Sequence, residues 1–174
     1  MALSNDDIDA FFTDPRFGTK IKAYGGCLLQ TELEDMTPEP HKFYVINFLR
    51  QQDPADEIGH WVAVWNMRPS YILYVDPFGQ PPPETILAFM KRARKTNGER
   101  KNVIFSTTDL QDLNSDFCGH FVLIIIKELM KGQSLLTILS DFDLLNTKLN
   151  DMLVKRLMRD RYFATVDGHQ PNIV

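Results

Sequence analysis

Two short runs of β-prone residues in the middle of the chain constrain its fold more than any other feature. The runs are His60–Trp65 and Tyr71–Val75, and five residues separate them. Runs of this composition at this separation predict a β-hairpin. The second strand has to end at the Asp-Pro-Phe-Gly sequence that follows it, because Pro77 has no N–H to donate to a sheet and Gly79 permits a turn.

The predicted hairpin brings a histidine and a carboxylate to one edge of the sheet. His60 opens the first strand, and Asp76 follows the second strand directly. In an antiparallel pair the start of one strand neighbours the end of the next, so Asp76 can reach the His60 ring. A carboxylate in this position fixes the tautomer and the orientation of the ring, and it leaves the other ring nitrogen to face a nucleophile.

A mostly buried helix is predicted over Cys118–Lys131. Ser115 or Asp116 is the candidate N-terminal cap, and Gly132 is the expected end of the helix. The apolar run Phe121–Ile126 would bury this helix against the sheet and hold its first residue in place.

Cys118 is the candidate nucleophile. A helix N-terminus and a nearby imidazolium both lower the pKa of a thiol, and His60 would supply the imidazolium. A tetrahedral intermediate also needs hydrogen-bond donors where its negative charge develops. The backbone N–H of Cys118 can be one donor, and the side-chain amide of Gln111, seven positions earlier, offers the second.

The remaining pattern predicts a single α+β domain over residues 1–174, with strands in the middle of the chain and helices at both ends. The glycine and proline residues of segment 17–40 predict turns. The other predicted elements are a helix over Ser4–Phe12, a strand over Phe43–Leu49, a helix over Pro83–Lys95, a strand over Asn102–Ser106 and an amphipathic helix over Phe142–Arg159. The apolar face of the last helix is expected in the core and consists of Leu145, Leu149, Met152, Leu153 and Leu157.

Composition excludes several classes of protein. The 174 residues are 44% hydrophobic and 24% charged, which is typical of a soluble globular domain. Two cysteines, Cys27 and Cys118, do not make a disulfide framework, so a reducing compartment is expected. The first twelve residues are acidic, unlike a secretory signal, and the longest apolar run is too short to cross a bilayer.

The candidate site residues and their surroundings resemble the adenovirus maturation protease, adenain, and its relatives. The resemblance is carried by His60-Trp61, by Val75–Gly79 and by the stretch from Gln111 to Gly119. These segments follow the family's order of histidine, acid, glutamine and cysteine, and the resemblance spans about residues 43–126. The wider group includes the SUMO-deconjugating proteases, in which the glutamine usually lies one position closer to the cysteine.

This resemblance implies a papain-like cysteine protease fold of adenain type, with a central mixed or antiparallel sheet and the nucleophile on a buried helix. It also implies a narrow cleft that accepts glycine before the cleaved bond. Trp61 and Gly119 are the residues expected to contact substrate in that cleft. The implied catalytic roles are nucleophile for Cys118, base for His60, orientation of that base for Asp76 and oxyanion donor for Gln111.

Three features depart from the pattern of adenain. The acid is Asp76 where adenain has Glu, although Asp is common among the SUMO proteases. His120 replaces an apolar residue two positions after the nucleophile, and the sequence suggests no role for it. Adenain is basic and is activated by DNA and a viral peptide, whereas this chain has a formal net charge of -4. A nucleic acid is therefore not expected as an essential cofactor.

The predicted function is that of a viral maturation protease, a cysteine endopeptidase that cleaves capsid or core precursor proteins at glycine-containing sites. Its chemistry needs no cofactor, although a peptide activator would suit a protease that works only inside a particle. The expected partners are protein substrates and not membranes, and the chain is expected to be a monomer. The expected location is the virion and the cytoplasm or nucleus of the infected cell.

Two other functions stay open at this point. A deconjugating protease for SUMO or another ubiquitin-like modifier needs the same narrow cleft. A catalytically silent module with a protease fold would bind peptides without cutting them, and Cys118 taken alone could be a buried core thiol. A metal site is not predicted, because the set Cys27, His41, Cys118 and His120 lacks paired ligand spacing.

Overall fold

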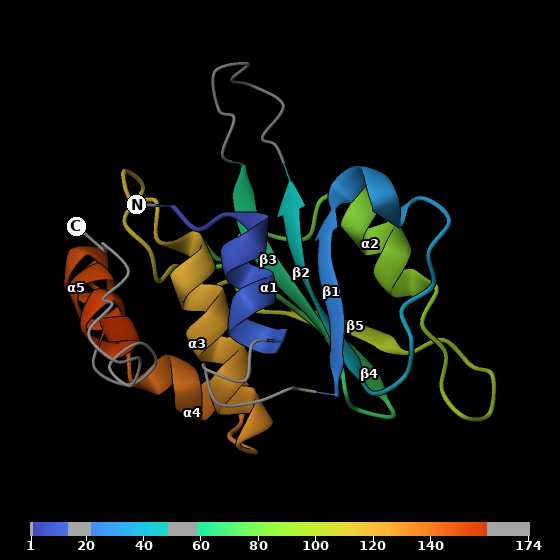
Figure 1. Cartoon of the computed structure of the whole chain (residues 1–174). Coiled ribbons are helices and arrows are strands. Elements are labelled where there is room, and N and C mark those ends of the chain that lie inside the picture. The colour runs from blue at the N-terminus through green and yellow to red at the C-terminus, as the bar shows by residue number, and fades with distance from the viewer. Residues whose placement is uncertain (1, 14–21, 49–58, 160–174) are drawn as a thin grey trace.

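The computed structural model describes residues 2–13, 22–48 and 59–159, which form a sheet with helices on both faces (Figure 1). The elements in chain order are α1 (Asn5–Thr13), β1 (Tyr24–Leu29), the 3-10 helix η2 (Gln30–Leu33), β2 (Lys42–Phe48), β3 (His60–Asn66), β4 (Tyr71–Val75), α2 (Glu84–Lys91), β5 (Asn102–Phe105), α3 (Cys118–Met130), α4 (Leu135–Ser140) and α5 (Thr147–Leu157).

The sheet has five strands, which lie side by side in chain order from β1 to β5. The central strands β2, β3 and β4 pair antiparallel, whereas β1 is parallel to β2 and β5 is parallel to β4. The predicted hairpin is present as β3 and β4 at the centre of this sheet. The mixed sheet, and the buried helix α3 that begins at Cys118, confirm the predicted α+β class and its arrangement.

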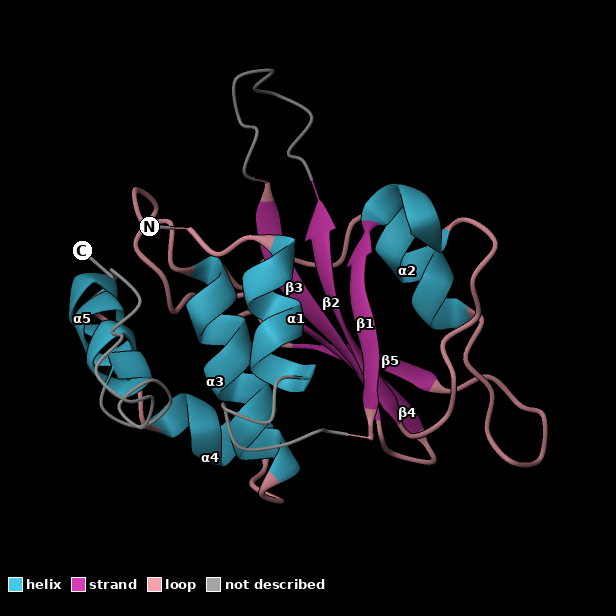
Figure 2. Cartoon of the chain, in the orientation of Figure 1, coloured by secondary structure: helices cyan, strands magenta, loops and turns pink. Residues whose placement is uncertain are grey.

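Helices cover the sheet from two sides, which explains why β3 is buried along its whole length. Trp61 and Ala63 face a core shared with α1 and α3, while Val62 and Val64 face a second core shared with α2. Successive side chains of a strand point to opposite faces, so a strand covered on both sides reads as a continuous apolar run. Figure 2 shows α1 and α3 on one side of the sheet and α2 on the other.

Most predicted elements are present with small shifts at their ends. The helix predicted over Pro83–Lys95 is shorter than expected, since α2 ends at Lys91. Beyond it the chain turns back at Asn97-Gly98, where the Lys95 N–H donates to the Glu99 carbonyl at 2.7 Å. Three elements were missed, namely β1, η2 and α4. β1 contains Gly25-Gly26, and its pairing with β2, rather than local propensity, holds it extended.

The apolar face predicted for the C-terminal helix is wrong. Leu145 is 98% exposed and Met152 is 68% exposed, and Leu149 is also exposed. The residues that α5 buries are Asn150 and Val154, while Leu153 and Leu157 are half-buried against the core. Hydrophobic periodicity did not predict which face of this helix is buried, because the inward residue is the polar Asn150. Its polar atoms all form hydrogen bonds inside the protein.

Candidate active site

His60 and Asp76 meet at the end of the central hairpin. Pairing of β3 with β4 places Ala63 opposite Val75. Continued by one residue, this register places Asp76 opposite Val62 and therefore diagonal to His60. Diagonal neighbours on antiparallel strands are about 7–8 Å apart, a gap that an imidazole ring can span. His60 Nε2 lies 2.8 Å from Asp76 Oδ1, so the predicted contact is present, through a diagonal pair rather than a directly opposed one.

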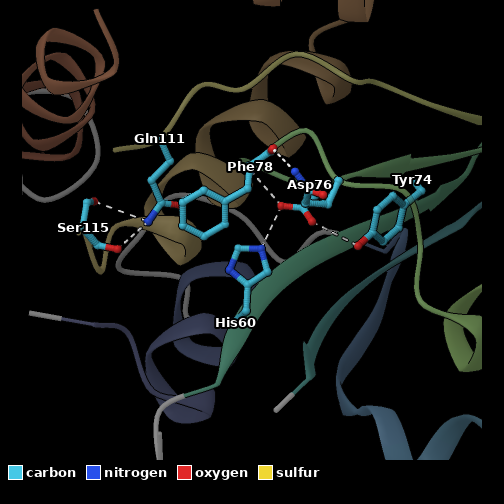
Figure 3. Close-up of polar contacts among 7 residues, drawn as sticks. His60, Tyr74, Asp76, Phe78, Gln111 and Ser115 are labelled. Carbon is cyan, nitrogen blue, oxygen red and sulfur yellow. Dashed lines mark hydrogen bonds and ion pairs between the residues drawn. The ribbon is translucent and has the colours of Figure 1, made fainter. Parts of the chain in front are cut away.

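The turn after β4 fixes the Asp76 carboxylate, as Figure 3 shows. The Phe78 backbone N–H donates to Asp76 Oδ1 at 2.8 Å, and the Tyr74 hydroxyl donates to Oδ2 at 3.4 Å. Gly79 closes the turn with its N–H on the Asp76 carbonyl at 2.9 Å and has a φ of 62°, a conformation that favours glycine. The Asp-Pro-Phe-Gly sequence therefore aims one carboxylate oxygen at the histidine.

Two aromatic rings hold His60 in place. Its ring stacks on Phe78 with 4.8 Å between centroids and meets Phe48 edge to face at 5.3 Å. Burial lowers the pKa of His60, but hydrogen bonds with Asp76 and with the Cys118 thiol raise it, and the resulting pKa lies above its ordinary value. Because Nε2 is taken by Asp76, Nδ1 is the ring nitrogen left to interact with the Cys118 sulfur.

Cys118 is the first residue of α3 and is buried. The predicted caps Ser115 and Asp116 are wrong, since the N-cap residue is Phe117 and it makes no side-chain cap hydrogen bond. The Ser115 hydroxyl instead accepts from the Phe117 N–H at 3.2 Å. A cap side chain therefore does not offset the positive end of the α3 dipole next to the thiol.

Gln111 is buried in the loop between β5 and α3, and its amide is turned toward Ser115 (Figure 3). Its Nε2 donates to the Ser115 carbonyl at 2.7 Å, and the Ser115 hydroxyl lies at 3.4 Å. A carbonyl can only accept, which fixes the amide nitrogen on this side. Gln111 Oε1 is buried without a hydrogen-bond partner among the described residues. Donation to an oxyanion would use the second N–H, and this role of Gln111 stays a prediction.

Trp61 and Gly119 pack against each other beneath Leu3. Trp61 is fully buried, and its indole N–H donates to the Leu3 carbonyl at 2.9 Å. A Cβ added to Gly119 would lie 3.1 Å from the indole and 3.2 Å from the Leu3 side chain, so glycine allows this close approach. The N-terminal segment thus covers both residues, and their contact with substrate stays a prediction.

Three aromatic residues of the site were not identified from the sequence, namely Phe48, Tyr74 and Phe78. The strand register is the signal that could have found one of them, because the β3–β4 pairing, continued past its last pair, places Phe78 opposite His60. Phe48 ends β2, where the observed pairing sets it against His60. A sequence without a known register does not show either relation.

Neither a cluster of metal-binding side chains nor a membrane-spanning helix is found in the parts of the chain that the structure describes. Within residues 2–13, 22–48 and 59–159, no three side chains of His, Cys, Asp or Glu come together in a way that could hold a metal ion. None of the helices in these ranges is long and apolar enough to cross a membrane.

No protein-family model and no curated protein sequence matches this chain. Solved structures do match it. The ASFV pS273R protease superposes with a TM-score of 0.55 at 16% identity, over 76% of this chain and 59% of that one. The C-terminal Ulp1 protease domain, solved in complex with Smt3, the yeast ortholog of SUMO, superposes with a TM-score of 0.52 at 15% identity. That match covers 90% of this chain and 76% of the Ulp1 domain.

The fold is that of the pS273R and Ulp1 proteases. The resemblance seen in the sequence is thereby confirmed at the level of the fold. A shared fold does not assign a function by itself, so the chemistry of this chain has to be argued from its own site. In that site the His60 ring is hydrogen-bonded to the Asp76 carboxylate, and the Cys118 thiol lies close enough to raise the pKa of His60.

Proposed function

We propose that this protein is a cysteine endopeptidase with Cys118 as its nucleophile. The observation that carries the proposal is the line from the Cys118 thiol to the His60 ring and on to the Asp76 carboxylate. The thiol begins an uncapped helix, and the imidazole beside it has a raised pKa, so His60 is suited to take the thiol proton when Cys118 attacks a substrate. A silent binding module would have no need of this arrangement.

The first half of the reaction forms an acyl-enzyme. The Cys118 thiolate attacks the carbonyl carbon of the scissile peptide, and the carbonyl π electrons move onto oxygen. The Cys118 backbone N–H and the second amide N–H of Gln111 stabilise this oxyanion. The C–N bond then breaks as His60 gives its Nδ1 proton to the leaving amine, while Asp76 holds the ring by Nε2.

The second half releases the acid product. Neutral His60 accepts a proton from a water molecule at Nδ1, and the resulting hydroxide attacks the thioester carbon. Collapse of the second tetrahedral intermediate expels the Cys118 thiolate, and the imidazolium–thiolate pair is restored. Each step uses groups of this chain and water, so we propose that the chemistry needs no cofactor, while a peptide activator could order the site.

The substrates that we propose are viral structural precursors cut at glycine-containing sites. Two observations support this: the adenain-like spacing of Gln111 and Cys118 in the sequence, and the structural similarity to a protease of ASFV. This chain spans 59% of the length of the ASFV protease. The proposed setting is the virion and the infected-cell cytoplasm or nucleus, with the enzyme as a monomer.

Deconjugation of a ubiquitin-like modifier is the second candidate. The observation that favours it is the structural match to the Ulp1 domain, which covers 90% of this chain and was solved with Smt3 bound. A modifier tail ending in glycine would need the same nucleophile and the same oxyanion donors. The two candidates therefore differ in the partner that the protein surface recognises, and not in the bond chemistry.

Cleavage profiling of a diverse peptide library by the purified protein tests the proposal, with Cys118→Ala assayed beside it. Probes carrying SUMO and ubiquitin tails are included in the same series. We expect cuts after glycine-containing motifs, no reaction with the tails and no activity in Cys118→Ala, which should fold and bind peptide as before. Reaction with a SUMO tail would select the second candidate, and turnover by Cys118→Ala would refute the mechanism.

A lack of turnover with every substrate needs a further measurement. Alkylation of Cys118 by iodoacetamide at mildly acidic pH reports the thiolate directly, because a free thiol reacts slowly there. Rapid alkylation that depends on His60 would show an intact nucleophile that lacks an activator or its substrate. Slow alkylation would show that the site is silent, and the endopeptidase proposal would be abandoned.

A further inference from the structure

Asn150 is a buried polar residue of α5, far from Cys118 in the sequence but tied to the loop that precedes it. We propose that Asn150 is a positioning residue that holds this loop, residues 106–117, in the shape that Gln111 needs to stabilise the oxyanion. The inference rests on the proposed function, in which Gln111 is an oxyanion donor. It assigns a part in the reaction to the C-terminal helix.

The Asn150 side chain uses its whole amide to connect two segments. Its Nδ2 donates to the Leu110 carbonyl at 3.0 Å and to the Asp143 carbonyl at 2.8 Å. Its Oδ1 accepts from the Asp143 N–H at 2.8 Å. Asn150 is only 1% exposed, so these bonds are shielded from water and loss of one would leave a buried polar atom unpaired.

The bond to Leu110 acts directly on Gln111. The Leu110 carbonyl and the Gln111 N–H belong to one rigid peptide unit. Asn150 holds the oxygen of that unit, and the Pro77 carbonyl accepts from its N–H at 3.2 Å. The peptide that leads into Gln111 is therefore fixed at both of its polar atoms, from α5 on one side and from the Asp76 turn on the other.

The next residue of α5, Asp151, lies beside the acceptor of the Gln111 side chain. Burial raises the pKa of the Asp151 carboxyl, and the neighbouring Ser115 side chain and Asp112 backbone lower it in part. Its Oδ1 is buried without a hydrogen-bond partner among the described residues. Ser115 is the residue whose carbonyl receives Gln111 Nε2 at 2.7 Å. Asn150 thus fixes the backbone from which the Gln111 side chain starts, and Asp151 lies next to the acceptor on which that side chain ends.

Loss of the Asn150 amide should displace Gln111 without disturbing the nucleophile. Removal of one oxyanion donor costs about 10²- to 10³-fold in kcat, and a donor misplaced by about 1 Å can cost 10²-fold. The thiolate depends on His60 and on the start of α3, which the Asn150 side chain does not contact. Asn150→Ala should therefore lower kcat roughly tenfold or more, with KM and the rate of Cys118 alkylation unchanged.

The test is a double-mutant cycle on the full chain, with a peptide substrate from the library. Asn150→Ala, Gln111→Ala and the double variant are compared with Val154→Ala, a control that truncates a buried apolar residue one turn further along α5. We expect kcat to fall in Asn150→Ala but by less than about twofold in Val154→Ala, at equal folded fraction. We also expect the double variant to match Gln111→Ala. Multiplicative losses in the double variant, or equal losses in the two α5 variants, would overturn the proposal.

Hydrogen exchange at the Leu110 and Gln111 amides gives a readout that does not need turnover. Exchange should speed up in Asn150→Ala and not in Val154→Ala, and unchanged exchange in Asn150→Ala would overturn the proposal. If the wild-type chain cleaves nothing, alkylation of Cys118 decides whether the proposed function fails, while hydrogen exchange still decides whether Asn150 holds the loop. Asn150→Asp keeps the acceptor for the Asp143 N–H but loses the bonds donated to the Leu110 and Asp143 carbonyls, and it replaces Asn150→Ala if that variant does not fold.

Discussion

Two histidines are buried to the same extent in this protein, yet their surroundings give them opposite properties. His60 is 3% exposed and His120 is 2% exposed. His60 is bonded to Asp76 and to the Cys118 thiol, and its pKa is raised. His120 meets the Phe117 ring edge to face at 5.0 Å, and its buried Nδ1 has no hydrogen-bond partner among the described residues. Burial lowers the pKa of His120 to about 4.

The comparison shows that partners, and not burial, make a histidine useful for proton transfer. Desolvation alone keeps a buried imidazole neutral, as it does at His120. At His60 the carboxylate and the thiol outweigh the same penalty. His120 lies two positions from Cys118 in the sequence, and His60 lies on a strand far earlier in the chain, so sequence distance would have selected the wrong residue.

The most direct test of this comparison is to replace each histidine, in a separate variant, by a residue that cannot transfer a proton. His60→Ala should lower kcat/KM by roughly 10²- to 10⁴-fold, because the proton donor and acceptor of both half-reactions is lost. His120→Gln should stay within about threefold of the wild type, because nothing in the proposed steps uses its ring. Kinetics on the best library peptide check both values, and a large loss in His120→Gln alone would reverse the assignment.

Asp76→Asn should make the surroundings of His60 similar to those of His120, whose buried ring lacks a charged hydrogen-bond partner among the described residues. The ring would stay buried but lose its charged partner, so the pKa of His60 should fall below the wild-type value. Turnover should fall by about 10²-fold or more, because a neutral amide does not stabilise the His60 imidazolium as the carboxylate does. An NMR titration of the His60 ring protons measures the pKa. Asp141→Asn, on an exposed residue at the end of α4, is the matched control, and an unchanged pKa in Asp76→Asn would contradict this account.

The sequence was sufficient to predict the part of the site that is built on strands, namely His60 and Asp76. The β-prone runs and the turn-forming residues around His60 and Asp76 predicted a hairpin, and regular strand pairing brings these two residues into contact. The start of α3 was also predicted, but its cap was not, because Ser115 uses its hydroxyl on Phe117 instead.

The half of the site that is built on a loop was less predictable. The Gln111 loop takes its shape from bonds to Pro77 and Asn150, which lie in two other segments, and from the bond between Gln111 and Ser115 inside the loop. No local pattern encodes such bonds, and the apolar periodicity of α5 pointed to the wrong inward face for the same reason. Tertiary hydrogen bonding overrode hydrophobic patterning at Asn150.

His120 should make the free energy of unfolding depend on pH. The folded-state pKa of His120 is about 4, below the ordinary value of about 6.5, so the unfolded state binds a proton in that interval that the folded state does not. Protonation of His120 in the unfolded state should therefore lower the free energy of unfolding by about 2 kcal/mol at pH 5 relative to pH 8. Urea unfolding of wild type and His120→Gln checks this, because the variant should gain that amount relative to wild type on going to pH 5.

His60 should change the free energy of unfolding with pH in the opposite direction and by a smaller amount. The folded-state pKa of His60 is raised, so its stabilisation is complete below the ordinary pKa of about 6.5 and is lost as the pH rises through the folded-state value. The effect is smaller because burial opposes the two partners at His60, whereas it is the dominant cause at His120. The difference in unfolding free energy between wild type and His60→Gln should therefore shrink between pH 5.5 and pH 8. A difference that grew over this range would mean that the ring is neutral in the folded protein, and the imidazolium–thiolate pair on which the proposed chemistry depends would not form.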